Sequence, residues 1–399
     1  MLENFQQELD ELESHGLLRR CRRVVPLENG KIRVDGKTLL HLASNSYLGL
    51  HQHPRVIGRA VEATRRYGTG AGSARLIGGT LELHEELEEA IAAFKQAESA
   101  LLFSTGYMAN LGVVTALAGS GDLVIGDRLN HASLVDACRL SGATFRVYPH
   151  KDVERLQTIL RQRRKNYNRV FIVTEGLFSM DGDVAPLLEL AELADRYDVF
   201  LIVDDAHGTG VLGPHGRGSL EQCGVSPAHH RGRIIQVGTF SKALGSLGGF
   251  AAGPKVVIEF LRNKARSFIY TTALPAACAA ASLEALRIVE EEETVRAQLW
   301  NNVRLWISGL ERIGVKLISK ESPIVSLAIG QTRQTMACAE NLFENGFYAP
   351  GIRPPTVPQG QARIRTSITA VHAPADLDRA LLAFEKIFAP ETSQGVPCR

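Results

Sequence analysis

Acidic, basic and hydroxyl side chains follow three short apolar runs of the sequence, and their types could do acid–base and nucleophilic chemistry. Asp204 and His207 come directly after the run 199–203, and Lys242 comes shortly after the run 233–237. A carboxylate can keep a ring nitrogen protonated, and a lysine amine can form an imine with an aldehyde. Comparable groups are Glu175 and Ser179 after the run 169–174, and Thr239 and Ser241 just before the lysine.

The elements that must position these groups alternate along the first three quarters of the chain. Short apolar runs alternate with helical patterns, which indicates a mostly parallel α/β sheet covered by helices on both faces. The runs lie at 100–105, 122–127, 144–150, 169–176, 199–208 and 233–242. Because ligands bind beyond the carboxyl ends of the strands in such sheets, we expect the polar groups to meet in one crevice.

The alternation stops at about Leu283. A long helical pattern at 284–314 and a strand-like run at 362–369 then predict a smaller α+β domain. The expected division is an N-terminal helix and arm at 1–45, a large domain at 46–283 and a small domain at 284–399.

The segment FSTGYMAN (103–110) lies between an apolar run and a helical pattern, and it predicts an anion site. The first backbone N–H groups of a helix are free to bind a phosphate, and the hydroxyls before the lysine can add hydrogen bonds to it. His131, which follows another apolar run, can stack on a flat ring. Together with Lys242 and Asp204, these groups are what pyridoxal 5′-phosphate (PLP) requires.

Each of these residues taken alone also fits a structural role. Asp204 could cap a helix or form an ion pair, Lys242 could be a solvated surface charge, and His131 could be a loop residue. The Asp-Asp-Ala-His sequence at 204–207 could offer metal ligands, but no other His or Cys cluster accompanies it, so we expect no metal. The glycines of GTGVLG (208–213) lack the following helix of a dinucleotide-binding loop. The joint placement at strand ends is what favours PLP.

The bulk composition excludes several classes of partner. The chain has 45 basic and 43 acidic residues, so no global field favours nucleic acid or a membrane surface. No apolar run approaches the roughly 18 residues of a membrane span, and the N-terminus lacks the pattern of a signal peptide. The six cysteines are scattered with no CxxC pair, which predicts free thiols in a reducing cytoplasm.

Eight short motifs are spread along the chain between residues 44 and 367. They are SNSYLGL (44–50), GTGAGSARLIGG (68–79), FSTGYMAN (103–110), NHASL (130–134), TEGLFSMDGD (174–183), VDDAHGTGVLG (203–213), TFSKALGSLGG (239–249) and ARIRTS (362–367). In this order they resemble the α-oxoamine synthase family of fold-type I PLP-dependent enzymes. The resemblance implies an α/β fold, with a mostly parallel seven-stranded sheet between helices in the large domain and a smaller α+β C-terminal domain.

The resemblance also implies roles at the cofactor. Lys242 would bind the cofactor aldehyde, and Asp204 would pair with the ring nitrogen. His207 would hydrogen-bond the phenolic oxygen, and His131 would stack on the ring face. The other residues expected around the cofactor are Gly106, Tyr107, Glu175, Ser179, Thr239 and Ser241, with Thr271 and Thr272 reaching the phosphate from the second subunit of a homodimer.

For the substrates, the family pattern implies a second set of residues. Arg365 resembles the arginine that grips the amino-acid carboxylate, where the guanidinium fork suits the task. Arg19 and Arg353 are candidates for the far end of the acyl chain. The full expected substrate set is Arg19, Asn45, His131, Arg353, Thr356 and Arg365.

A C-acyltransferase activity follows from the resemblance. STGYMAN, the IRPPTVP signature within 351–365 and the short N-terminus favour the branch that condenses L-alanine with a pimeloyl thioester, on coenzyme A or acyl carrier protein, in biotin synthesis. An enzyme that joins glycine to acetyl-CoA and another acyl-CoA oxoamine synthase remain open. A non-catalytic partner subunit is a further alternative, although such a subunit would not need Lys242.

Overall fold

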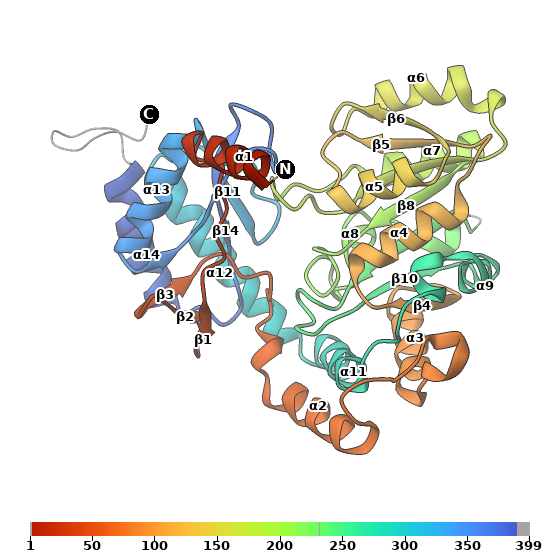
Figure 1. Cartoon of the computed structure of the whole chain (residues 1–399), viewed down its shortest axis with the longest axis horizontal. Coiled ribbons are helices and arrows are strands. Elements are labelled where there is room, and N and C mark those ends of the chain that lie inside the picture. Colours follow the sequence, from red (N-terminus) through yellow and green to blue (C-terminus); the bar gives the residue numbers. More distant parts are fainter. Residues whose placement is uncertain (1, 231, 389–399) are drawn as a thin grey trace. The chain divides into compact units, whose positions relative to one another are not determined.

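The computed structural model describes residues 2–230 and 232–388, and the chain divides into two compact units (Figure 1). Unit 1 is formed by the described parts of Met1–Tyr47, Met180–Asp183 and Ala297–Arg399, and unit 2 by Leu48–Ser179 and Val184–Arg296. The expected domain limits, at 45/46 and 283/284, stay a prediction about independently folding parts.

Unit 2 is built on a seven-stranded sheet in the order β4-β10-β9-β8-β7-β5-β6. Only β10 is antiparallel to its neighbours, so the other six strands run in one direction. The strands are β4 (Ser99–Phe103), β5 (Leu123–Asp127), β6 (Thr144–Tyr148), β7 (Val170–Glu175), β8 (Phe200–Asp204), β9 (Ile234–Thr239) and β10 (Gly249–Gly253). The predicted mostly parallel α/β sheet is confirmed, and the carboxyl ends of six strands share one edge.

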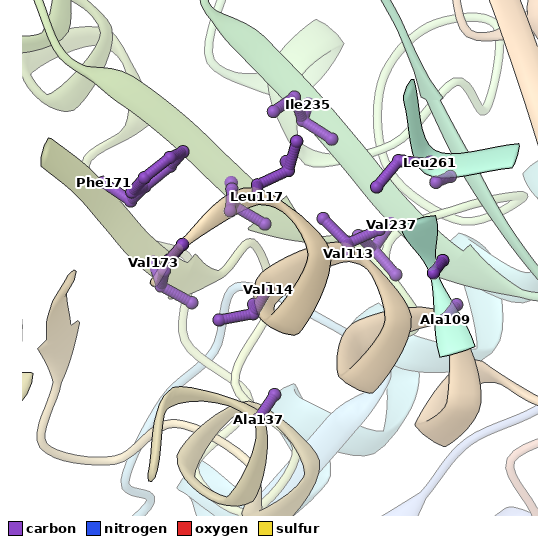
Figure 2. Close-up of a cluster of buried hydrophobic side chains, with 14 of the residues drawn as sticks. Ala109, Val113, Val114, Leu117, Ala137, Phe171, Val173, Ile235, Val237 and Leu261 are labelled. Atoms are coloured by element: carbon purple, nitrogen blue, oxygen red, sulfur yellow. The ribbon is translucent and has the colours of Figure 1, made fainter. Parts of the chain in front are cut away.

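Helices cover both faces of this sheet, which is why its strands are apolar at nearly every position. On one face, α4 packs against β7 and β9 through side chains such as Val113 and Val114 (Figure 2). On the other face, α6 and α7 bury leucines such as Leu156 and Leu190 against β5, β7 and β8. The helices of unit 2 are α2 (Pro54–Tyr67), α3 (Glu82–Phe94), α4 (Gly106–Leu117), α5 (Ala132–Leu140), α6 (Val153–Arg163), α7 (Leu187–Tyr197), α8 (Ser219–Gln222), α9 (Lys255–Lys264), α10 (Arg266–Ile269) and α11 (Ala276–Glu291), with short turns of helix at η1 (Leu50–Gln52), η2 (Arg75–Gly79), η3 (Arg164–Asn166) and η4 (Pro227–His229).

Unit 1 is an α+β unit with two small sheets, in the orders β1-β2-β3-β12 and β11-β14-β13. Its strands are β1 (Val24–Pro26), β2 (Lys31–Val34), β3 (Lys37–His41), β11 (Ile324–Gly330), β12 (Phe347–Tyr348), β13 (Gly351–Ile352) and β14 (Ala362–Ser367). Its helices are α1 (Leu2–Ser14), most of α12 (Glu293–Arg312), α13 (Thr332–Glu344) and α14 (Pro374–Phe388). The predicted α+β character of the C-terminal part is confirmed.

The single long helix expected at 284–314 is wrong. The helix α11 ends at Glu291, Glu292 leaves the helical conformation, and α12 begins at Glu293. Four successive glutamates at 290–293 place negative charge at the C-terminal end of α11, where the helix dipole disfavours it. Arg55 pairs with Glu291 and Glu292 there.

Two further expectations concern the whole chain. Among the described residues, no helix is both long and apolar enough to cross a bilayer. Cys21, Cys138, Cys223 and Cys278 are free thiols, whereas Cys338 takes part in a disulfide, so the expectation of six free thiols is wrong there. Cys398 lies outside the described residues, and the cytoplasmic location stays a prediction.

Candidate active site

Two carboxyl groups lie side by side at the carboxyl edge of the large sheet. Glu175 ends β7 and Asp204 ends β8, and the two residues are direct partners in the parallel ladder. Both are buried. The Asp204 carboxylate accepts a hydrogen bond from Asn110 Nδ2 at Oδ2 (2.6 Å) and one from the backbone N–H of Ala206 at Oδ1 (3.0 Å). These contacts hold Asp204 as an acceptor at the strand end.

A chain of hydrogen bonds joins Asp204 to His131. Asn110, the fifth residue of α4, donates from Nδ2 to Asp204 and also to Ser133 Oγ (2.9 Å). Ser133 Oγ lies 2.8 Å from His131 Nδ1, and the Ser133 N–H donates to the same nitrogen at 3.2 Å. Because Nδ1 accepts, a neutral His131 carries its proton on Nε2. The network fixes both the ring and the carboxylate.

The positions of Asn130 and Ser179 explain how Glu175 is held. Asn130 Oδ1 accepts the Glu175 N–H (3.1 Å), while its Nδ2 donates to the carbonyl of Val173 (2.8 Å). Glu175 Oε2 accepts the Ser179 N–H at 3.1 Å, and the backbone of His131 also hydrogen-bonds the buried carboxylate. The loop that carries His131 is therefore tied to β7.

The electrostatic surroundings of Glu175 and His131 favour the neutral form of each side chain. The pKa of Glu175 is raised to about 8, mainly by burial and next by the charge of Asp204, while the charge of Lys242 opposes the shift. Burial lowers the pKa of His131, with Asp204 acting in the opposite direction and Lys242 in the same one. The charges of Asp204 and Lys242 thus act on both Glu175 and His131, so the four groups belong to one cluster.

The start of α4 forms an anion cradle next to the end of β9. Thr105 caps the helix by accepting the Met108 N–H at Oγ1 (3.1 Å). A Cβ on Gly106 would lie only 3.1 Å from Thr239 Cβ, and one on Gly249 would lie 2.5 Å from the Thr105 carbonyl oxygen. The two glycines therefore let the helix N-terminus approach the Thr239 hydroxyl, and a helix N-terminus is suited to bind phosphate.

The loop that carries Lys242 is held in shape by hydrogen bonds of its own hydroxyl groups and glycine backbone. Thr239 Oγ1 donates to the Gly248 carbonyl (2.7 Å) and lies 2.8 Å from Ser241 Oγ. Lys242 is partly exposed, and its carbonyl accepts the Gly245 N–H (3.0 Å). Gly245 has φ +65°, and a Cβ there would lie 2.3 Å from the His51 N. The loop is a tight turn that holds Lys242 at the strand end.

The remaining predicted cofactor residues lie in unit 2 as well. His207 is buried two residues beyond Asp205, and Tyr107 is half exposed and hydrogen-bonds Asp136. Thr272 is exposed, and its carbonyl accepts a hydrogen bond from Ser104 Oγ (3.0 Å). Thr271, its partly exposed neighbour, lines the same small pocket near the end of β4.

The predicted carboxylate-binding arginine lies in unit 1. Arg365 is buried on β14, where it donates to Ser367 Oγ (2.9 Å) and to Asn45 Oδ1 (3.2 Å). The fully buried Tyr47 also hydrogen-bonds Arg365, and burial raises the pKa of Tyr47 to about 12. Asn45 and Tyr47 from the SNSYLGL motif thus help to fix the guanidinium of Arg365.

The two arginines expected at the acyl chain are neighbours in unit 1. Arg19 Nη2 donates to Thr356 Oγ1 (3.1 Å), and Arg353 Nη2 donates to the Leu18 carbonyl (2.9 Å). Burial lowers the pKa of Arg353, and the charge of Arg19 lowers it further. Among residues 2–230 and 232–388, neither guanidinium has a carboxylate partner. Arg353 also lines a cavity of about 290 Å³ with Leu18.

Sequence reasoning missed Asn110, Ser133 and Tyr47. Each lies inside one of the eight family motifs, but each contacts another predicted site residue rather than an open space. A polar residue inside an otherwise apolar helix, such as Asn110 in GYMANLGVV, was the available signal. The roles of the predicted site residues stay predictions at this point.

The Glu175 carboxyl gives a first prediction, on stability against pH. Its pKa in the folded chain lies above the ordinary value of 4.5, so ionising it costs stability as the pH rises from about 4.5 to about 8. We expect Glu175→Gln to gain stability relative to the parent across this window, with a slope of at most about 1.4 kcal/mol per pH unit. Urea unfolding of cofactor-free protein at several pH values measures it, and a difference independent of pH would contradict it.

Residues 37–384 match the family described as Aminotransferase class I and II. A serine palmitoyltransferase structure that contains PLP superimposes with a TM-score of 0.89 at 33% identity, covering 96% of each chain. The chain therefore belongs to the aminotransferase class I and II family, and its fold is that of the fold-type I PLP-dependent enzymes.

Within that family, several similar relatives carry the name 8-amino-7-oxononanoate synthase. The 8-amino-7-oxononanoate synthase of Geobacter metallireducens is 48% identical over 383 residues, which are 96% of this chain and 97% of the relative. A crystal structure of the 8-amino-7-oxononanoate synthase of Francisella tularensis has a TM-score of 0.75 at 30% identity, covering 87% of this chain and 97% of that one. The chain groups with the 8-amino-7-oxononanoate synthases.

Proposed function

We propose that this chain catalyses the PLP-dependent condensation of L-alanine with a pimeloyl thioester, giving 8-amino-7-oxononanoate, carbon dioxide and a free thiol in biotin biosynthesis. The observation that carries the proposal is the cluster of Asp204, His131, Glu175 and Lys242 at one edge of the sheet. Near-full-length similarity to relatives of that name supports the choice of reaction.

The residues present fit the cofactor. The α4 N-terminus beside Thr239 and Ser241 suits its phosphate, because Gly106 leaves room that a Cβ would fill. The Asp204 carboxylate suits the ring nitrogen, and His131, whose ring is fixed by Ser133, suits the ring face. Buried Asn110 Oδ1, which has no hydrogen-bond partner among the described residues, is a polar atom that a polar ligand would satisfy.

The chain's own groups then have distinct tasks. PLP, when bound, withdraws electrons from the bonds to the amino-acid Cα. Lys242 would bind the cofactor aldehyde through Nζ and would take the Cα proton of the bound alanine as the general base. Asp204 would keep a proton on the ring nitrogen, and His207 would donate to the phenolic oxygen. The overall reaction joins the alanine Cα to the acyl carbon, releases the thiol and carbon dioxide, and returns a proton to that Cα.

The substrate ends are assigned to unit 1. Arg365 would bind the alanine carboxylate with two parallel N–H donors, the geometry that suits a guanidinium and a carboxylate. Arg19 and Arg353 would bind the distal carboxylate of the pimeloyl chain, since neighbouring cations without a carboxylate partner among the described residues suit an anion. Coenzyme A and acyl carrier protein both remain candidates for the acyl carrier.

A homodimer with shared sites belongs to the same proposal. Large apolar side chains are exposed close to Thr271 and Thr272: Tyr270 is 71% exposed, and Ile77 in the loop bridged to Thr272 is 84% exposed. Where exposed apolar side chains form one contiguous patch, they can mark a surface that a partner covers. A second copy would bury them and could bring the two threonines to a phosphate.

Replacing Arg365 gives a second prediction. Arg365→Lys keeps the charge but loses the bidentate fork, so we expect the KM for L-alanine to rise about tenfold or more. Arg363→Lys is the matched control, because Arg363 lies on the same face of β14 and is already paired with Asp181. Steady-state kinetics with varied alanine measure both variants, and an equal rise in the control would contradict the assignment.

The proposed function is tested by two coupled measurements. The absorbance of the PLP-loaded protein is titrated with alanine, glycine and serine, and thiol release is then followed with pimeloyl-CoA and acetyl-CoA. We expect the largest response with alanine and pimeloyl-CoA. A preference for glycine and acetyl-CoA would assign the chain to the glycine C-acetyltransferases, and no spectral response to any amino acid would overturn the proposal.

A further inference from the structure

The residue after Asp204 makes a second, separate network. Asp205 is 1% exposed, and its Oδ2 lies 2.7 Å from Lys95 Nζ, an ion pair closed off from solvent. Asp205 Oδ1 accepts the Ser219 N–H at 3.0 Å. Lys95 Nζ also donates to the carbonyl of Arg217 (2.5 Å), and Thr209 Oγ1 lies 3.2 Å from Asp205 Oδ2. One carboxylate thus joins the end of α3, the turn after β8 and the start of α8.

The backbone is shaped around this carboxylate. A Cβ on Gly208 would lie 2.1 Å from Asp205 Oδ1, and one on Gly218 would lie 1.7 Å from Asp205 Oδ2. A Cβ on Gly176 would lie 3.1 Å from Asp205 Oδ1. Real Cβ atoms do not approach as closely as at Gly208 and Gly218, so these two glycines leave room for the Asp205 side chain, and the contact at Gly176 would be tight. This accounts for the glycine at 208 that the sequence analysis found unsuited to a nucleotide.

Hydrogen bonds hold both ends of the turn 205–209, which carries His207. The backbone of Asp204 and Asp205 is already fixed by the neighbouring strands, through the Gly176 N–H to the Asp204 carbonyl and the Asp205 N–H to the Val237 carbonyl. Beyond these bonds, the turn is held at its start by the Asp204 carboxylate on the Ala206 N–H and at its end by Thr209 against Asp205.

We propose that Asp205, neutralised by Lys95, is a positioning residue that fixes the turn 205–209 and thereby the orientation of His207 beside Asp204. Asp205 forms the buried ion pair with Lys95, whereas Asp204 accepts a hydrogen bond from Asn110. The two adjacent carboxylates therefore have different partners. The kinetic part of this inference rests on the proposed function, and the structural part does not.

The alternative is that the ion pair serves stability only. A buried pair is costly to desolvate, and breaking one side leaves an unpaired buried charge, so lost stability alone would not distinguish the two roles. Asp122 provides a matched control. It is equally buried, accepts the backbone N–H groups of Gly119 and Arg169, and pairs with the Arg169 guanidinium (2.7 Å), but it lies at the opposite, amino edge of the sheet.

The test compares Asp205→Asn, Gly208→Ala and Asp122→Asn in the PLP-loaded protein. Hydrogen exchange followed by mass spectrometry measures the amides of 205–209, and kinetics measure kcat and the KM for alanine. Gly208→Ala displaces the carboxylate without changing the charge, so it serves as the second route where Asp205→Asn fails to fold.

We expect Asp205→Asn and Gly208→Ala to speed exchange at 205–209 and to lower kcat about tenfold or more with little change in KM, since a small misplacement of a reacting group has effects of this size. Asp122→Asn should lower the urea midpoint without either change. Unchanged exchange at 205–209, or a kcat loss equal to that of Asp122→Asn, would overturn the inference. A parent protein with no turnover would count against the proposed function and would leave the exchange result valid.

Discussion

Replacing Lys242 by alanine is expected to abolish turnover and to remove the visible absorbance of the lysine-bound cofactor. In the proposed mechanism the Lys242 amine would bind the aldehyde and then move the Cα proton, and an alanine side chain can do neither. General acid–base catalysis contributes about 10² to 10⁴ in rate, so we expect kcat to fall by about 10³ or more.

The surroundings of Lys242 make this variant informative. The turn is held by Thr239 Oγ1 and by the backbone of Gly245 and Gly248, and none of these bonds uses the lysine side chain. The fold should therefore survive the change. Lys165→Ala is the matched control, because Lys165 is exposed in η3, away from the sheet edge. Visible absorbance and turnover kept in Lys242→Ala would refute the assignment.

The alternation of short apolar runs with helical patterns predicted most strands of the large sheet. All six apolar runs that were expected as strands became β4 to β9. The missed strand is β10, Gly249–Gly253, whose sequence GFAAG has no β-branched residue and two glycines. It forms because β4 and β9 pair with it on both sides and because Gly249 fits against Thr105. Tertiary pairing overrode a weak local preference there.

The site was predictable as a set of residue types, but its supporting contacts were not. Asp204, His131 and Lys242 stand at strand ends or helix starts, which local patterns reveal. The bonds from Asn110 to Ser133 and to Asp204 join positions 23 and 94 residues apart. Only the packing of α4 and α5 on the sheet brings such distant positions together.

The sequence also could not show why glycine is needed at a particular position when the cause is a contact with another side chain. Sequence reasoning could reject a dinucleotide loop at 208–213, but it could not say why a glycine was needed at 208. The reason is the carboxylate of Asp205, which occupies the space of a Cβ. A glycine demanded by a neighbouring side chain leaves no periodic signal, whereas a glycine in a turn does.

Asp204→Asn should separate cofactor binding from proton removal. A neutral amide cannot hold a proton on the ring nitrogen by charge, so the electron demand at the amino-acid Cα weakens. Asn110 Nδ2 and the Ala206 N–H both donate to Asp204, and an amide NH₂ would face one of these donors without an acceptor. The phosphate cradle at α4 is untouched, so we expect PLP to bind while Cα-proton exchange of L-alanine falls about 100-fold or more.

Exchange is measured by NMR as the uptake of deuterium from heavy water at the alanine Cα, with no acyl thioester present, so the acyl-binding residues do not enter. Asp127→Asn is the matched control: Asp127 ends β5 at the same sheet edge, is buried, and accepts the backbone N–H groups of Leu129 and Lys151. Losing that charge costs stability without touching the ring nitrogen, so alanine exchange should persist. If Asp204→Asn exchanged as fast as this control, the carboxylate would be a structural partner of Asn110, and the proton on the ring nitrogen would need another source.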